Sequence, residues 1–236
     1  MTDVAALWDF GDPAGSEARF RAAAEEAEGA ERLVLLTQLA RALGLQERYA
    51  EGHAVLDHLT VRDDEVAVRS ELERGRLLRS AGSPDDARPH LEAAARAAAE
   101  AGLEALHVDA LHMVALVAPA AEQGALTEQA LAVARSAQDP AARRWEASLL
   151  NNLGMVHADA GDWDAALATF ERALAVRRQQ GEAGPTRVAR WMVGWALRNL
   201  GRTDEARAVQ TALKAELEAA GEEDPYVDEE LALLGG

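Results

Sequence analysis

The stretch that decides the fold reads Leu150-Asn151-Asn152-Leu153-Gly154-Met155-Val156-His157. It is followed by Gly161-Asp162-Trp163 and then by Ala166, Phe170 and Ala173. Gly154 and Ala166 are small, as a close crossing of two helix axes requires, and Phe170 can fill the space beside them. The stretch therefore predicts a helix-turn-helix pair held together by small and large side chains.

Related patterns recur along the chain. The next copy contains Val193, Gly194, Leu197, Gly201, Ala206 and Leu213, and an earlier one contains Gly75, Leu78, Gly82, Ala87, Leu91 and Ala94. Weaker copies cover residues 36–59 and 111–134, and a truncated copy at the N-terminus begins with a first helix of about two turns. The large side chain of each copy stands at position 20, 56, 91, 131, 170 or 210, where Gln210 is a polar exception. Helix pairs therefore repeat every 35 to 40 residues.

These offsets resemble the tetratricopeptide repeat (TPR), most specifically in residues 147–214. The resemblance implies that Gly161 ends the first helix of the clearest pair and that Trp163 belongs to the second. The long period is similar to that of the repeats in kinesin light chains and bacterial peptide-pheromone receptors. The resemblance implies an all-α, right-handed superhelical solenoid of about five and a half helix-turn-helix repeats plus a C-terminal capping helix. It also implies a function in binding another protein or a peptide.

Composition agrees with an all-α protein and excludes several functions. Hydrophobic residues make up 49% of the chain and aromatic residues only 4%, and Ala and Leu, which favour helices, carry most of the apolar share. A formal charge of −17 opposes binding to nucleic acid or to anionic membranes. The chain lacks cysteine, a basic N-terminal signal region and any long apolar run, so we expect a cytoplasmic protein without disulfides or a membrane span.

We expect one solenoid domain over residues 1–236. Its helix pairs should lie at about 2–28, 30–60, 64–101, 103–138, 140–180 and 184–220, with a cap at 225–233. Four of these helices should begin at a proline that follows a capping side chain. The four capping residues with their prolines are Asp12-Pro13, Ser83-Pro84, Asp139-Pro140 and Asp224-Pro225.

Two further prolines and the residues of the last helix also predict local structure. Pro89 and Pro119 fall within helical patterns, where each should cause a kink or an early stop. In the capping helix, Asp228, Glu229 and Glu230 are expected to face water. Leu231, Leu233 and Leu234 are expected to cover the final repeat.

No arrangement of residues predicts catalysis. Asp109 and His112 share one helix face, but helical proteins contain such pairs by chance, and His53 and His58 are five residues apart and so do not stack as metal ligands. Acidic clusters such as Glu222-Glu223-Asp224 lack the loop that calcium requires. There is also no glycine-rich phosphate loop or nucleophile elbow. We therefore expect no cofactor, no metal and no enzyme activity.

The first helix of each pair should line the concave face of the solenoid, where a protein or peptide partner would bind. The residues expected there are Arg41, Arg69, Arg76, Arg79, His112, Asn151, Asn152, Met155, Trp191, Trp195, Arg198 and Asn199, together with Gln38 and Glu73. Arginine binds carboxylates with two parallel hydrogen bonds, so an acidic or C-terminal peptide would suit this face. Alternatively, these arginines pair with Glu73 or with neighbouring helices.

The similar repeats of peptide receptors imply a role for the asparagines. There, asparagines at matching positions hold the backbone of an extended peptide, and Asn152 is the closer match, with Asn151 beside it. Trp191 and Trp195 could anchor an apolar group of the partner, or they could pack beneath the capping helix.

A second function is self-association. An uncapped end of a solenoid exposes apolar surface, so the end repeats could form a homodimer without a separate ligand. Trp8 and Phe10, near the truncated first repeat, are candidates for that contact.

Overall fold

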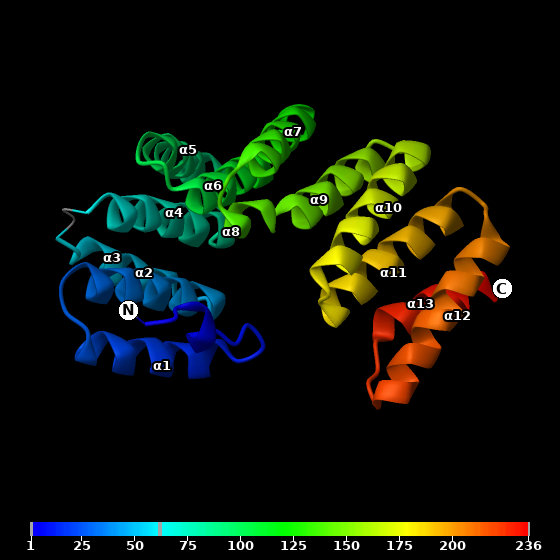
Figure 1. Ribbon diagram of the computed structural model, residues 1–236, viewed down its shortest axis with the longest axis horizontal. Coiled ribbons are helices and arrows are strands. Elements are labelled where there is room, and N and C mark those ends of the chain that lie inside the picture. The colour runs from blue at the N-terminus through cyan, green and yellow to red at the C-terminus, as the bar shows by residue number, and fades with distance from the viewer. Residues whose placement is uncertain (1, 61–62, 236) are drawn as a thin grey trace. The chain divides into compact units, whose positions relative to one another are not determined.

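The computed structural model describes residues 2–60 and 63–235, and every regular element in these ranges is a helix (Figure 1). A short 3-10 helix, η1 (Ala5–Leu7), precedes the α-helices. These are α1 (Pro13–Glu26), α2 (Gly29–Leu45), α3 (Tyr49–Asp57), α4 (Asp64–Ser80), α5 (Pro84–Glu100), α6 (Glu104–Val117), α7 (Ala120–Ser136), α8 (Pro140–Arg143), α9 (Glu146–Asp159), α10 (Trp163–Gln180), α11 (Ala183–Asn199), α12 (Thr203–Ala220) and α13 (Pro225–Leu234). The all-α fold of consecutive helix pairs is confirmed.

The helices form two compact units, Met1–Ala142 and Arg143–Gly236, called here unit 1 and unit 2. Within unit 1, α1 packs on α2, α4 on α5, α5 on α6 and α6 on α7, and the first helices α2 and α4 also contact each other. Within unit 2, each helix from α9 to α13 packs on the next. Each unit is therefore built from pairs of sequential helices.

Small residues allow the paired helices to approach closely. A Cβ atom added at Gly154 on α9 would lie 2.4 Å from the ring of Phe170 on α10, whose side chain is fully buried. The same relation holds between Gly75 on α4 and Leu91 on α5, where the distance is also 2.4 Å. The glycines thus leave space that the large side chain of the second helix fills.

Glycines also set the length of the helices in unit 2. Gly161, Gly181, Gly201 and Gly221 end α9, α10, α11 and α12, each with a positive φ between 70° and 76°. This left-handed conformation is readily adopted by glycine at the end of a helix. The four glycines recur every 20 residues, so each helix and its turn occupy the same length of chain.

Several local expectations differ from the structure. The first helix of the N-terminal pair is a single 3-10 turn, η1, and not two α-helical turns. After Pro140 the helix α8 has only four residues, and the first helix of that pair, α9, begins at Glu146. Ser83 precedes α5 but its side chain makes no capping hydrogen bond, whereas Asp12 and Asp224 do cap their helices.

The two internal prolines behave differently. The early stop expected at Pro119 is confirmed, since α6 ends at Val117 and α7 begins at Ala120. At Pro89 the early-stop alternative was wrong, because α5 continues through it to Glu100, and the kink stays a prediction. Pro89 and Asp85, four residues earlier, are both exposed, so water can satisfy the carbonyl group that lacks its helical hydrogen bond.

Most of the expected orientation of the capping helix α13 is confirmed, since Asp228 and Glu229 are exposed and Leu231 and Leu234 pack on the preceding helices, but two positions differ. Val227, Glu230 and Leu234 are buried, whereas Leu233 is 58% exposed. Residues three and four apart share one face of a helix, so 227, 230 and 234 point the same way and 233 does not. The prediction that Glu230 faces water and Leu233 covers the repeat was therefore wrong.

Candidate functional site

The predicted partner-binding residues lie on the first helices of the pairs, in both units. Arg41 is on α2, Arg69, Arg76 and Arg79 are on α4, and His112 is on α6, all in unit 1. Asn151, Asn152 and Met155 are on α9, and Trp191, Trp195, Arg198 and Asn199 are on α11, all in unit 2.

Arg76 is bound by two carboxylates inside unit 1. It donates to Glu73, one turn earlier on α4, and its Nη2 donates to Asp109 Oδ1 on α6 at 2.5 Å. Burial lowers the pKa of Arg76, but Asp109 and Glu73 together outweigh burial and raise it. Because Glu73 is only 1% exposed, this cluster is part of the protein interior. Arg76 thus follows the alternative in which an inward arginine pairs with Glu73.

Two other predicted arginines also have carboxylate partners within the chain. Arg69 Nη2 lies 2.7 Å from Glu65, one turn earlier on α4. Arg198 forms two 2.8 Å hydrogen bonds with Glu230 on α13, which raise the pKa of Arg198. The charges of Arg69 and Arg198 are therefore compensated before any partner binds.

Arg41 and Arg79 remain without a carboxylate within salt-bridge distance among the residues that the structure describes. The Arg41 guanidinium lies 5.4 Å from the ring centroids of both Trp8 and Phe10, close enough for cation–π attraction. Burial, and then the charge of Arg76, lower the pKa of Arg41. Arg79 lies on the last turn of α4 and is exposed. Among the predicted arginines of unit 1, these two are the ones whose charge no described carboxylate compensates directly.

A pocket of about 190 Å³ brings both arginines together in unit 1. It is lined by Arg41, Gly44, Leu45, Glu73, Arg76, Leu77, Arg79, Ser80 and Met113. Glu73 Oε1 accepts from Arg76, but Glu73 Oε2 is buried and has no hydrogen-bond partner. The sequence did not predict this pocket, because Leu45, Leu77 and Met113 look like ordinary core positions of their helices.

His112 lies near this cluster, close enough for Asp109, Arg76 and Arg79 to influence its pKa. Burial lowers the pKa of His112 to about 4, so the imidazole is neutral at pH 7. Asp109, its neighbour on α6, is committed to Arg76. Over residues 2–60 and 63–235, no three His, Asp or Glu side chains come together as a metal site would require. No helix in the same ranges has the length and apolar character needed to cross a membrane.

The asparagines of α9 are both half-buried. Asn152 has an interaction within the chain, whereas the side chain of Asn151 makes no hydrogen bond with any described residue. On α11, Asn199 differs, because its Nδ2 donates to the carbonyl of Trp195 at 2.8 Å. Asn151 therefore keeps both a donor and an acceptor available.

The tryptophans of α11 contact their own unit. Trp191 Nε1 donates to the carbonyl of Tyr226 on α13 at 3.1 Å, and its ring packs with Leu213, Leu217 and Val227. Trp195 stands edge-on to Trp163 at 4.8 Å and joins the core cluster around Phe170, which Met155 also contacts. Trp191 is thus packed beneath the capping helix, as the packing alternative expects.

At the N-terminal end, Trp8 also belongs to the core. Its Nε1 donates to Gln38 Oε1 at 3.1 Å, and its ring contacts Phe20 and Phe10. Phe10 is 60% exposed. Of the two residues considered for self-association at this end, only Phe10 presents a largely open ring.

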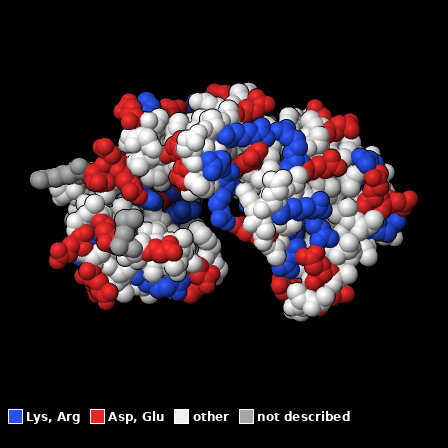
Figure 2. Space-filling view, viewed as in Figure 1, with Lys and Arg blue, Asp and Glu red and all other residues white. Residues whose placement is uncertain are grey.

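Charge is distributed unevenly between the pocket and the rest of the surface. In the view of Figure 2, acidic and basic side chains are interspersed over each unit, and the chain as a whole carries −17. The pocket lining, by contrast, contains three arginines and one glutamate. The pocket is therefore a locally basic position on an acidic protein.

Comparison with known proteins agrees with this fold. Residues 145–212 match the tetratricopeptide repeat family. No protein with a curated description matches the sequence.

Several solved structures have a similar fold. TPR-like repeats assigned to a kinesin light chain of Podospora anserina share 17% identity, with a TM-score of 0.61 over 80% of this chain and 96% of that chain. BtubC (BKLC) from P. vanneervenii shares 19% identity, with a TM-score of 0.67 over 95% of each chain. The quorum sensor NprR from B. thuringiensis shares 16% identity, with a TM-score of 0.60 over 96% of this chain and 64% of that chain.

At these identities the similarity concerns the fold alone. The family match and the glycine, alanine and phenylalanine positions of α9 and α10 agree on the same repeat. Residues 145–212 therefore match the tetratricopeptide repeat family, and the helical fold of the chain is similar to that of the TPR-like repeats of kinesin light chain and of the quorum sensor NprR.

Proposed function

We propose that this protein is a non-catalytic cytoplasmic scaffold that captures an extended segment of another protein or a peptide along its first helices. The observation that carries the proposal is the free amide of Asn151, which is half-buried on α9 beside Asn152. An amide both donates and accepts, so it can pair with the N–H and C=O groups of an extended backbone.

Two further observations support this proposal. A structure with the same fold contains NprR with its cognate peptide NprX, and another contains a Rap protein with Competence and Sporulation Factor. In this chain, Arg41 and Arg79 lack carboxylate partners among the described residues, so an acidic group of the partner would be favoured in unit 1.

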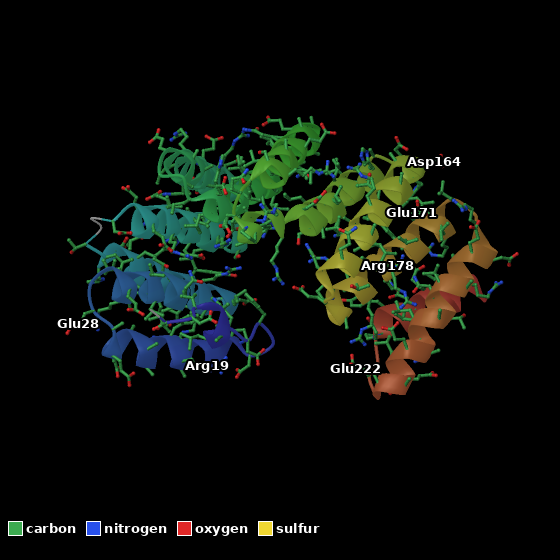
Figure 3. All side chains as sticks on the ribbon, in the orientation of Figure 1. Arg19, Glu28, Asp164, Glu171, Arg178 and Glu222 are labelled. Atoms are coloured by element: carbon green, nitrogen blue, oxygen red, sulfur yellow. The ribbon has the colours of Figure 1, made fainter. Side chains whose placement is uncertain are left out.

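The test is capture of a partner by matched variants. Asn151→Ala removes the free amide, and Arg79→Glu reverses an exposed charge; neither residue is part of a buried cluster. Arg76 is unsuitable for this test, because replacing it would leave Glu73 and Asp109 buried without their counter-ion. Glu171, exposed on the second helix α10 (labelled in Figure 3), provides the control variant Glu171→Ala.

We expect a partner bound by the wild type and by Glu171→Ala to be lost from Asn151→Ala and weakened by Arg79→Glu, with all four proteins equally helical and equally stable. The Arg79 effect should shrink as salt is raised, because salt screens an exposed charge. Equal capture by all four proteins would contradict recognition by the first helices.

A second candidate function is self-association through the C-terminal end repeat. An apolar pocket of about 290 Å³ is lined by Val188, Trp191, Met192, Asp224 and Tyr226. Val188 is 54% exposed and Tyr226 is 65% exposed, although both are large and apolar. If this surface forms a homodimer, Val188→Glu should convert the dimer to a monomer in light-scattering measurements, and Phe10→Glu at the other end should not.

A further inference from the structure

Two arginines line the unit 1 pocket without an oxygen acceptor for their N–H groups. Arg41 and Arg79 form no hydrogen bond or salt bridge with any described residue. Arg41 is half-buried, and the rings of Trp8 and Phe10 attract its charge but supply no oxygen to its N–H groups. Polar groups taken out of water normally have partners, so an unpaired guanidinium beside a pocket points to an anionic ligand.

The charges around the pocket match a ligand with one negative charge. Arg76 is held between Glu73 and Asp109, so these three side chains together carry one excess negative charge. Arg41 and Arg79 add two positive charges, which leaves the group with one positive charge in excess. Glu73 does not compete for them, because its Oε1 accepts from Arg76 and its Oε2 is buried away from the pocket. A monoanion therefore neutralises the group, whereas a doubly charged phosphate ester would leave a negative excess.

The rest of the lining is largely apolar. Leu77 and Met113 are buried, whereas Leu45, the last residue of α2, is 48% exposed. An apolar group seated in the pocket would cover Leu45 and remove its surface from water. The pocket volume of about 190 Å³ is below the range of roughly 300–1,000 Å³ found for sites that enclose drug-sized molecules, so this apolar group is short.

The lining favours a free acid over the end of a peptide. A C-terminal leucine would also present a carboxylate and an apolar side chain, but its amide N–H would need an acceptor. Glu73 is occupied or buried, so Ser80 is the one lining side chain left to accept from that N–H. A free aliphatic acid makes no such demand.

We infer that the unit 1 pocket binds a short-chain aliphatic carboxylic acid in its ionised form. The carboxylate accepts from Arg41 and Arg79, as is typical of arginine, and the aliphatic chain packs on Leu45, Leu77 and Met113. This is a small-molecule site within unit 1, and it does not depend on the capture of an extended partner.

The experiment is calorimetric titration of the full chain with isocaproate, isocaproamide, acetate and N-acetyl-L-leucine. We expect saturable binding of isocaproate, and binding at least tenfold weaker for isocaproamide, which lacks the charge, and for acetate, which lacks the aliphatic chain. Absence of isocaproate binding at millimolar concentration overturns the inference, as does equal binding of the amide or of acetate. Tighter binding of N-acetyl-L-leucine than of isocaproate overturns it in favour of a peptide terminus.

Variants locate the site. Arg79→Met and Leu45→Asn should each lower the affinity for isocaproate at least tenfold, and both positions are exposed, so the fold tolerates the changes. Arg69→Met is the control for the charge, since Arg69 pairs with Glu65 and does not line the pocket. Leu233→Asn, at a position that is 58% exposed in unit 2, is the control for the apolar surface. An equal loss of affinity in a pocket variant and its control overturns the assignment to this pocket.

This inference and the proposed scaffold function can fail independently. Partner capture is tested at Asn151 in unit 2, whereas acid binding is tested at Leu45 and Arg79 in unit 1. Asn151→Ala should therefore bind isocaproate as the wild type does. A chain that binds isocaproate but captures the same proteins with and without Asn151 would keep this site and lose the scaffold proposal.

Discussion

Arg198 on α11 and Glu230 on α13 form a salt bridge with two hydrogen bonds, which joins the capping helix to the last helix pair. The Arg198 Nε and Nη2 atoms each lie 2.8 Å from a different oxygen of Glu230, and Glu230 is only 3% exposed. Together with Val227 and Leu234, this contact defines the buried face of α13.

The first prediction concerns this salt bridge. Glu230→Ala should lower the free energy of unfolding by about 1–2 kcal/mol, because it leaves the partly buried guanidinium of Arg198 without its counter-ion. Urea denaturation followed by circular dichroism measures the change. Glu229→Ala, at an exposed neighbouring position, should change stability by less than about 0.5 kcal/mol. Similar values for the two variants would show that the salt bridge does not stabilise the cap.

A second prediction concerns Gln210, which occupies the position that Phe170 has in the preceding repeat. Gln210 is fully buried, its Oε1 has no hydrogen-bond partner, and its Nε2 makes only a 3.3 Å contact with the carbonyl of Trp191. Gln210→Leu should therefore raise the free energy of unfolding by about 1 kcal/mol, since it removes an unsatisfied polar atom at similar volume. Gln210→Ala should lower it by about 2 kcal/mol, because it leaves a cavity. A loss of stability in Gln210→Leu would mean that the amide is better satisfied than its contacts indicate.

A third prediction compares two glycines within unit 2. Gly154→Ala should cost about 1–3 kcal/mol, because the new methyl group would lie 2.4 Å from the buried ring of Phe170. Gly184 lies within α11 with no heavy atom within 4 Å of an added Cβ, so Gly184→Ala should be neutral or stabilise by about 0.5 kcal/mol. Thermal unfolding of the two variants measures the two changes in stability. If Gly154→Ala also proves harmless, the close helix crossing is not what requires glycine there.

The fourth prediction is a pH dependence that arises from His112. Burial holds the pKa of His112 at about 4, against an ordinary value of 6.5. Between these values the unfolded chain binds more protons than the folded chain, so stability falls as the pH falls. From about pH 7.5 to pH 5, His112 should account for a loss of about 2 kcal/mol.

Two variants isolate this contribution. His112→Gln should reduce the loss of stability between about pH 7.5 and pH 5, as measured by denaturation at each pH. His58→Gln, at an exposed position, should keep the pH dependence of the wild type. If His112→Gln leaves that dependence unchanged, other groups are responsible for it.

The helix pairs could be predicted from the sequence because their packing depends on neighbours within one repeat. Gly154 and Phe170 are 16 residues apart, and the small-large relation between them is visible in the sequence itself. The positions of the helix ends could also be predicted, because glycine and proline act on the local backbone. The N-terminal pair departed from the pattern, because its first helix is the single 3-10 turn η1.

The chemistry of the first helices could be predicted only in part. The register of a helix shows which residues share a face, so the positions of the arginines could be proposed. Apart from Glu73, their partners could not be predicted, because Asp109 reaches Arg76 from the next helix pair and Glu230 reaches Arg198 from the capping helix. Which arginine keeps an uncompensated charge depends on these contacts between repeats.

The glycines that recur every 20 residues in unit 2 also determine how side chains correspond between α9 and α11. Two such intervals separate equivalent positions, so Asn151 corresponds to Trp191, Asn152 to Met192 and Met155 to Trp195. Moving by one repeat thus replaces Asn151 and Asn152 by the apolar Trp191 and Met192 without changing their register. If a partner segment lies along these two helices as proposed, the amides of α9 would meet its backbone and the partly exposed Met192 of α11 would meet one of its side chains, so the segment would bind in a single orientation.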